Sequence, residues 1–233
     1  MLAVAGLSAH YGRAHILADV MLEVAAGEVM VLLGRNGAGK STTMKAIMGL
    51  VRPSAGRVVF QGQDIAGREP FEIARMGLGY VPEERRIFTD LTVMENLEVG
   101  RRPPSPGLLP WTPERLFTLF PSLGAMRGRP GGRMSGGEQQ MLTIARTLMG
   151  NPRLVLLDEP SEGLAPVVVE RMAEAIRALK GEGLSILLSE QNLHFARLVS
   201  DRATIIEKGR IRWTGTLPAL MEAPEVREQY LSV

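Results

Sequence analysis

Short apolar runs, separated by stretches of helical periodicity, dominate the hydrophobic pattern of the chain. Continuous runs at Val29–Leu33, 154–157 and 186–188 predict strands that are buried on both faces. Residues 204–206 predict a weaker fourth strand. Across Pro166–Gly181, apolar residues recur at three- and four-residue steps, which predicts a helix. Strands that alternate with helices in this way predict an α/β fold with a parallel sheet.

Two regions depart from this alternation. Near the N-terminus, short alternating stretches at 20–24 and 57–60 predict an antiparallel sheet at one side of the molecule. Residues 88–150 contain helical patterns without a convincing strand, so we expect a helical insertion there. Within that insertion, the stretch Pro103-Pro104-Ser105-Pro106 predicts a loop.

The composition supports a single folded domain and narrows its chemistry. A length of 233 residues and a hydrophobic fraction of 45% suit one globular domain, which we take as residues 1–233. The formal net charge of only +2 argues against a nucleic-acid partner. The chain has no cysteine, which excludes disulfides, thiolate metal ligands and cysteine nucleophiles. Its apolar runs are far shorter than the roughly 20 residues that span a bilayer, so we expect any membrane role to depend on partner chains.

A glycine-rich segment after the first apolar run carries the strongest motif, G-x-x-x-x-G-K-S/T. Its glycines allow consecutive N–H groups to face one centre, and the N-terminus of the helix expected next adds positive potential there. Lys40 is placed to reach the outer phosphates of a nucleotide, and the Ser41 hydroxyl is placed to bind Mg²⁺. The predicted phosphate-binding residues are Gly34, Arg35, Asn36, Gly37, Ala38, Gly39, Lys40, Ser41 and Thr42.

Two acidic residues follow the apolar run 154–157, so they lie at the carboxyl end of a predicted strand, where α/β folds bind ligands. Beside a phosphate loop, Asp158 is placed to support Mg²⁺ and Glu159 is placed to polarise the attacking water. Taken alone, the same acid pair is also typical of a strand end that caps a helix. The phosphate-loop motif favours the catalytic interpretation.

Residues 134–140, with the sequence Met-Ser-Gly-Gly-Glu-Gln-Gln, precede a predicted helix and offer small residues with free N–H groups. By itself this pattern also suits a simple helix cap. Because it stands about twenty residues before Leu-Leu-Asp-Glu-Pro, it resembles the signature motif of ABC ATPases. The resemblance covers residues 11 to 192. It implies ATP hydrolysis with Mg²⁺ and a P-loop NTPase (RecA-like) core with an antiparallel β subdomain and an α-helical subdomain inserted at 88–150.

The resemblance also implies roles for single residues. Ser135, Gly136 and Gly137 would contact ATP held by an opposite protomer, so that the complete site exists only in a head-to-tail dimer with a second copy or a sister ATPase. Tyr11 matches the aromatic residue that stacks on adenine, and a core tyrosine is the alternative. Residues 161–164 match the loop that links the two sites, although their Ser-Glu-Gly-Leu sequence is atypical.

Two positions depart from the usual pattern of the family. Glu83 stands where the family usually has glutamine; it can still offer an oxygen to Mg²⁺, but it adds negative charge. Gln191 occupies the place of the switch histidine, and its amide can hydrogen-bond the γ-phosphate but cannot accept a proton at pH 7. We therefore expect Gln191 to be a catalytic residue beside Glu159 that orients the γ-phosphate by a hydrogen bond and does not transfer protons. His194, three residues later, is the alternative switch.

These departures and several further stretches resemble one branch of the family, the ATPases of branched-chain (hydrophobic) amino-acid importers. The stretches are 33–40, 81–88, 91–97, 163–166 and 189–192. The resemblance implies two transmembrane permease subunits, a sister ATPase and, indirectly, a periplasmic or extracellular substrate-binding protein. It places the chain at the cytoplasmic face of the inner or plasma membrane, bound peripherally through its permeases.

Other members of the family remain alternatives. Importers of urea or short-chain amides and exporters of lipids use similar ATPases, and soluble ABC ATPases act in DNA repair, chromosome organisation or translation.

Within residues 83–90, we expect Arg85, Arg86 and Phe88 to meet a cytoplasmic helix of the permease. A solvated charged loop is the alternative for that segment.

Overall fold

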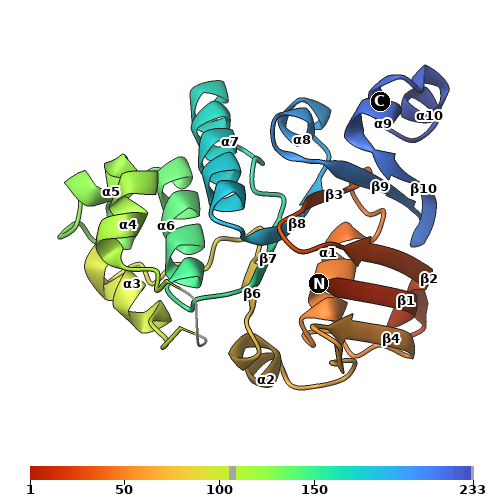
Figure 1. The fold of residues 1–233 in the computed structure, drawn as a ribbon, viewed down its shortest axis with the longest axis horizontal. Helices are drawn as coiled ribbons and strands as arrows, with labels where there is room; N and C mark the ends of the chain where they lie inside the picture. Colours follow the sequence, from red (N-terminus) through yellow and green to blue (C-terminus); the bar gives the residue numbers. More distant parts are fainter. Residues whose placement is uncertain (105–108, 232–233) are drawn as a thin grey trace.

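The structure, a computed structural model, describes residues 1–104 and 109–231 and shows two sheets with helices around them (Figure 1). Residues 105 and 106 of the predicted proline-rich loop lie outside the described residues. The smaller sheet is antiparallel, with strand order β2-β1-β4-β5. Its strands are β1 (Leu2–Tyr11), β2 (Ala14–Val24), β4 (Ala55–Phe60) and β5 (Gln63–Asp64). The predicted antiparallel sheet is confirmed.

The larger sheet has strand order β10-β9-β3-β8-β7-β6, and its neighbouring strands are parallel except for the pair β10–β9. Every residue of the three central strands β3, β8 and β7 is buried, as their continuous apolar runs predict. The α/β fold is therefore confirmed. The strands are β3 (Val29–Leu33), β6 (Leu78–Val81), β7 (Leu154–Asp158), β8 (Ser185–Glu190), β9 (Arg202–Glu207) and β10 (Arg210–Thr216).

The hydrophobic pattern does not predict the two outer strands, β6 and β10. Strand β6 has only four residues, and Gly79 and the half-buried Tyr80 interrupt its apolar run. Strand β10 lies at the sheet edge, and its residues alternate between exposed and half-buried. Both strands depend on the neighbour with which they pair more than on their own sequence.

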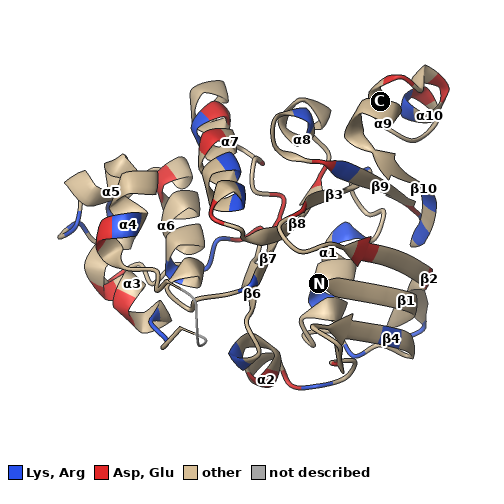
Figure 2. Ribbon diagram, viewed as in Figure 1, with Lys and Arg blue, Asp and Glu red and all other residues tan. Residues whose placement is uncertain are grey.

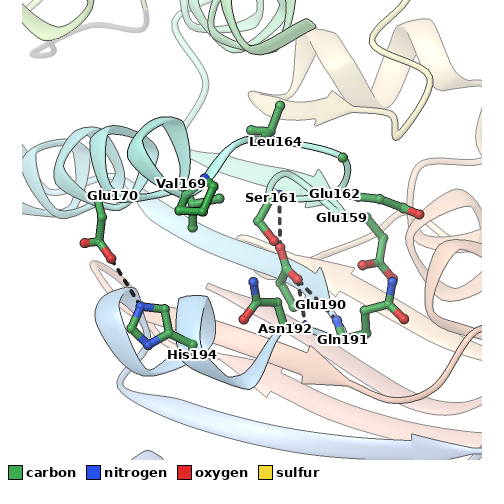
Figure 3. A pocket seen from close by; sticks show the side chains of 12 residues that line it. Glu159, Ser161, Glu162, Leu164, Val169, Glu170, Glu190, Gln191, Asn192 and His194 are labelled. Carbon is green, nitrogen blue, oxygen red and sulfur yellow. Dashed lines mark hydrogen bonds and ion pairs between the residues drawn. The ribbon is translucent and has the colours of Figure 1, made fainter. Parts of the chain in front are cut away.

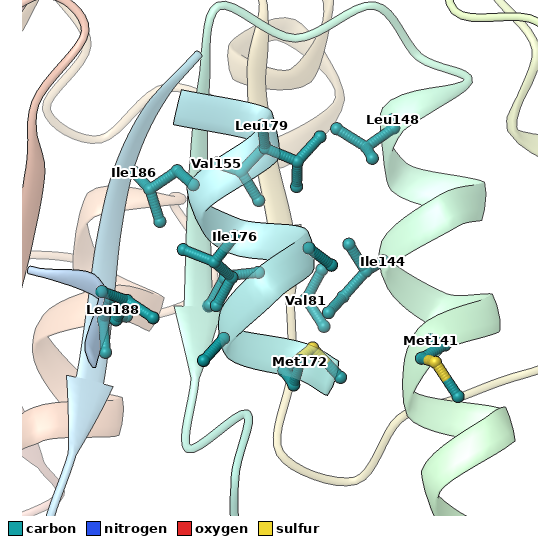
Figure 4. Packing of buried hydrophobic residues seen from close by; sticks show 14 of the residues in the cluster. Val81, Met141, Ile144, Leu148, Val155, Met172, Ile176, Leu179, Ile186 and Leu188 are labelled. Carbon is teal, nitrogen blue, oxygen red and sulfur yellow. The ribbon is translucent and has the colours of Figure 1, made fainter. Parts of the chain in front are cut away.

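Two hydrophobic cores lie on opposite faces of the large sheet. Alternate residues of β7 and β8, such as Val155 and Ile186, face α6 (Gly136–Leu148) and α7 (Pro166–Gly181) (Figure 4). The other face, including Leu156 and Leu187, packs against α1 (Lys40–Ile47) and the smaller sheet. The bounds of α7 match the prediction. The remaining helices outside 88–150 are α2 (Pro70–Arg75), α8 (Leu193–Val199), α9 (Leu217–Met221) and α10 (Pro224–Tyr230).

Between residues 88 and 150, the part of the chain that the structure describes forms helices and no strand. These helices are grouped together beside α7 in Figure 1, and their apolar residues join the core shared with α7. They are α3 (Val93–Gly100), α4 (Pro113–Leu119), α5 (Pro121–Ala125), a 3₁₀ turn at Gly131–Arg133, and α6. Charged residues of both signs lie along α7 and on other helices and strands (Figure 2). Among the described residues, none of the helices has the length and apolar character that crossing a membrane requires.

Candidate functional site

The glycine-rich loop runs from β3 to α1 with backbone geometry that glycine adopts without strain. Gly37 and Gly39 have φ angles of 77° and 111°, in the left-handed region. At Gly34, a Cβ atom would lie 2.4 Å from the carbonyl oxygen of Ile206 on β9, so the loop packs directly on the backbone of the sheet. The motif is therefore tied to the carboxyl end of β3, as predicted.

Lys40 is the first residue of α1, and its side chain is almost wholly buried beneath the loop. Its ammonium donates hydrogen bonds to the carbonyl oxygens of Gly34 (2.6 Å) and Arg35 (3.1 Å). It also forms an ion pair with Oε1 of Glu159 at 2.9 Å. A buried ammonium needs such partners, and the structure thereby joins the phosphate loop to the predicted catalytic acid.

Asp158, the last residue of β7, is fully buried and accepts three hydrogen bonds from side chains. The hydroxyl of Ser41 donates to Oδ1 at 2.9 Å, and the hydroxyl of Ser189 donates to the same oxygen at 2.6 Å. The hydroxyl of Tyr80 donates to Oδ2 at 3.0 Å. Two predicted metal ligands, Ser41 and Asp158, are thus in direct contact.

Glu159 has a φ of 47°, which is unusual for a residue with a side chain. Its N–H lies 3.2 Å from the carbonyl oxygen and 3.1 Å from the hydroxyl oxygen of Ser189, and these contacts hold it at the end of β7. Oε1 pairs with Lys40, whereas Oε2 is buried and has no hydrogen-bond partner among the described residues. A carboxylate with a free oxygen beside a cavity is suited to accept a hydrogen bond from water.

A cavity of about 390 Å³ brings together most of the predicted nucleotide-binding residues. Tyr11 lies at its wall and is 51% exposed, which excludes the core-tyrosine alternative. Glu83 and Glu162 add negative charge there. Partial desolvation, followed by repulsion from Glu162 and Asp158, raises the pKa of Glu83. The lining is Tyr11, Ile16, Asn36, Gly37, Gly39, Lys40, Ser41, Thr42, Glu83, Glu159 and Glu162.

The signature segment lies apart from this cavity. Ser135 is exposed and caps α6: its hydroxyl accepts from the N–H of Glu138 at 3.4 Å and donates to that side chain at 2.8 Å. A Cβ at Gly136 would lie 2.7 Å from the guanidinium of Arg85, and one at Gly137 would lie 2.6 Å from the side chain of a valine on α7. None of the three signature residues lines the cavity of its own chain.

A second cavity, of about 410 Å³, separates the two candidate switch residues (Figure 3). The side chain of Gln191 lies toward Glu159, the residue that pairs with Lys40 of the phosphate loop. His194 instead bonds to Glu170 on α7, with 3.1 Å between Nε2 and Oε1, at the other end. The geometry therefore favours Gln191 over His194 as the residue that reaches Glu159.

Sequence reasoning missed three polar residues of the site. Tyr80 and Ser189 both bond to Asp158, and burial together with that carboxylate raises the pKa of Tyr80. Glu190 is 1% exposed, and burial raises its pKa to about 7, although hydrogen bonds from Ser161 and Asn192 oppose the shift. For Ser189 and Glu190 the available signal was their position after the apolar run 186–188. Parallel strands end at the same edge of a sheet, so these residues end beside the acid pair.

The side chains present fit Mg²⁺ and a nucleoside triphosphate. Ser41 and Asp158 supply the hard oxygen atoms that Mg²⁺ prefers. Among the residues the structure describes, no three His, Cys, Asp or Glu side chains gather as a metal site. Such a sparse set is typical of Mg²⁺, which is held by one or two carboxylates together with substrate phosphates and water.

Comparisons with known proteins identify the family of the chain. A family model described as ABC transporter matches residues 17–162. BraG of Pseudomonas aeruginosa, a high-affinity branched-chain amino acid transport ATP-binding protein, is 41% identical over 231 residues, or 99% of each chain. LptB of Acidithiobacillus ferridurans, a lipopolysaccharide export system ATP-binding protein, is 37% identical over 95% of this chain and 92% of LptB. The ADP conformation of an ATP-binding cassette of an ABC transporter is 27% identical, with a TM-score of 0.82, over 98% of this chain and 97% of that one. The chain therefore belongs to the ABC transporter family and is one of its ATPases.

Proposed function

We propose that this chain is the ATP-hydrolysing subunit of a membrane importer of branched-chain or other hydrophobic amino acids. The observation that carries the proposal is the similarity to BraG, which is greater than the similarity to LptB and extends over nearly the whole of both chains. Glu83 and Gln191, the two departures from the usual family pattern, support the same branch. Lipopolysaccharide export is the second candidate, because LptB also aligns with most of the chain.

Lys40 and Glu159 carry the chemistry of the proposed reaction. Their ion pair at 2.9 Å engages one carboxylate oxygen of Glu159 while Lys40 faces its own loop. Binding of the outer phosphates by the loop N–H groups and Lys40 draws the ammonium away from Glu159. Glu159 then has both oxygens available to orient and polarise the attacking water, with Gln191 beside it. The pair thereby couples the arrival of substrate to the activation of the base.

Ser41, Asp158 and Glu83 are the residues that would hold Mg²⁺. The ion, when bound, neutralises charge on the phosphates and on the transferring group. Ser41 and Asp158 are already bonded at 2.9 Å, and Tyr80 and Ser189 fix the orientation of the carboxylate. The hydrogen bonds from Tyr80 and Ser189 leave the carboxylate of Asp158 little rotational freedom.

The separation of the signature segment from the phosphate cavity supports a site shared between two chains. Ser135, Gly136 and Gly137 lie at the N-terminus of α6, where backbone N–H groups and the helix dipole favour an anion. Since they do not line the cavity of their own chain, they are available to the nucleotide of a second copy or a sister ATPase.

The segment 83–90 is the proposed contact with a permease, through which the chain would bind the cytoplasmic face of the membrane. Arg85 and Arg86 both have left-handed φ angles, 64° and 51°. Their carbonyl oxygens accept hydrogen bonds from Thr143 (2.9 Å) and Arg146 (2.7 Å) on α6. Phe88 is 46% exposed. A strained loop fastened to α6 presents an aromatic side chain outward, which suits a partner helix.

Complementation tests the substrate assignment. A Pseudomonas aeruginosa strain that lacks BraG would receive this chain or its Lys40→Ala variant, and uptake of radiolabelled leucine would be measured. We expect uptake with the natural chain and none with the variant. A parallel strain depleted of LptB tests the second candidate; growth there, without leucine uptake in the first strain, would overturn the amino-acid proposal. Failure of the folded, purified chain to bind ATP would overturn the proposed reaction itself.

A further inference from the structure

Glu190 connects three segments of the candidate site through one residue. It ends β8, and its backbone carbonyl oxygen accepts a hydrogen bond from the N–H of Gly34, the first residue of the phosphate loop, at 3.3 Å. Its Oε1 accepts from the N–H of Ser161 at 3.1 Å. Its Oε2 accepts from the N–H groups of Gln191 (3.2 Å) and Asn192 (3.1 Å) (Figure 3).

The two carboxylate oxygens serve two different loops. Ser161 stands two residues after Glu159 and begins the loop 161–164, whereas Gln191 and Asn192 lead from β8 into α8. Accepting from both loops at once requires two acceptor oxygens and no donor, which an ionised carboxylate provides. A carboxamide of the same shape has one acceptor oxygen and an NH₂ group, so it can satisfy only one loop.

The arrangement is costly for the folded chain. Among the described residues, Glu190 forms no ion pair with any lysine, arginine or histidine. Hydrogen bonds from Ser161 and from the backbone N–H groups of Gln191 and Asn192 compensate its charge, and the carboxylate of Glu159 lies close enough to oppose it. A folded protein that buries a charge is often less stable than one with an apolar residue of similar size at the same position. A buried carboxylate in this position therefore serves the loops that it joins rather than the packing of the core.

We propose that Glu190 is a positioning residue for ATP hydrolysis, whose carboxylate fixes the loop 161–164 against the switch residue Gln191. By holding these segments together, it keeps Glu159 and Gln191 in one geometry relative to the phosphate loop. This inference rests on the proposed function, because it assumes that Glu159 and Gln191 act on ATP. In this role Glu190 acts through Glu159 and Gln191.

Glu190→Gln is the test, with Glu174→Gln as the matched control. The control removes the same charge from an exposed position on α7. For each full-length protein we would measure the Kd for ATP, kcat, KM, and amide hydrogen exchange at residues 161, 191 and 192. We expect Glu190→Gln to keep the Kd within about twofold while kcat falls by about tenfold to 100-fold. Amide exchange should accelerate at one or both loops and remain unchanged in β3 and α1.

Unchanged kcat and exchange in Glu190→Gln would refute the positioning role. A parallel loss of ATP binding and of protection throughout the chain would also refute it, since that result describes a structural residue. Glu190→Asp is the second variant, in case the first does not fold; it keeps two oxygens on a shorter arm and should show the same split between Kd and kcat. If the natural chain does not bind ATP, the proposed function fails, whereas the exchange measurement still tests whether Glu190 joins the two loops.

Discussion

The buried carboxylate of Glu190 predicts a pH dependence of folding stability that one substitution should remove. Burial raises its pKa from an ordinary value of 4.5 to about 7, and the carboxylate of Glu159 adds to the shift, while hydrogen bonds from Ser161 and Asn192 oppose it. In the unfolded chain the group therefore ionises at a lower pH than in the folded chain. Between these two pKa values, the folded state binds more protons, so stability falls as pH rises.

The magnitude follows from the interval between the two pKa values. An interval of about 2.5 pH units, at about 1.4 kcal/mol per unit, gives roughly 3 kcal/mol. The stabilising contribution is complete below pH 4.5, declines through the window up to about pH 7 and is absent above it. Between pH 5 and pH 8, linkage predicts that the natural chain loses roughly 2–3 kcal/mol of unfolding free energy through this group alone.

Chemical denaturation of the natural chain and of Glu190→Gln at a series of pH values measures this contribution. Every other titrating group is common to the two proteins, so the difference between their unfolding free energies isolates Glu190. We expect that difference to change by roughly 2–3 kcal/mol from pH 5 to pH 8, in favour of the variant at the higher pH. The Glu174→Gln control should run parallel to the natural chain. Parallel curves for the natural chain and Glu190→Gln would show that the carboxylate ionises normally and would refute the argument.

Three further predictions concern the reaction and the shared site. Glu159→Gln should lower kcat by about 100-fold or more and double the solution mass when Mg-ATP is added, as seen by light scattering. Gln191→Ala should lower kcat by at least about tenfold, whereas His194→Ala should not; the reverse order would make His194 the switch. Gly137→Ala would place a methyl group 2.6 Å from a valine side chain on α7 and should lower the unfolding free energy by about 1–3 kcal/mol in denaturation. Gly128→Ala, where nothing lies within 4 Å, is its control.

The elements that could be predicted are those in which the apolar pattern agrees with the residues that mark the ends of the element. Strand β3 combines a continuous apolar run with glycines that need left-handed or close-packed geometry, so both the strand and the loop after it follow from sequence. Helix α7 begins at Pro166 and ends at Gly181, where its apolar spacing and end signals agree. Strand β6 has end signals in Gly77 and Pro82 but no clean apolar run, and it forms because β7 offers it a parallel partner.

The contacts within the site could not be predicted, because they join residues that are remote in sequence. Lys40 and Glu159 were each assigned a role, but nothing in either motif indicates that the two side chains pair at 2.9 Å. That distance depends on β3 and β7 lying on either side of β8 in the sheet, with their carboxyl ends at the same edge. Strand order arises from the whole chain, and the pairing follows from it.

Glu190 shows how an apolar run can conceal a buried polar residue. The run 186–188 correctly predicts a buried strand, but on that evidence a glutamate two residues after it is expected to reach solvent. In the folded chain the loops after β7 and β8 close over the carboxylate, and their N–H groups replace the water that it loses. An acid that stays buried without a cationic partner has to be held by hydrogen-bond donors of the segments around it, so its presence indicates that those loops have a defined position. The loops concerned carry Glu159 on one side and Gln191 on the other, which is why the cost of this burial points to the geometry of hydrolysis.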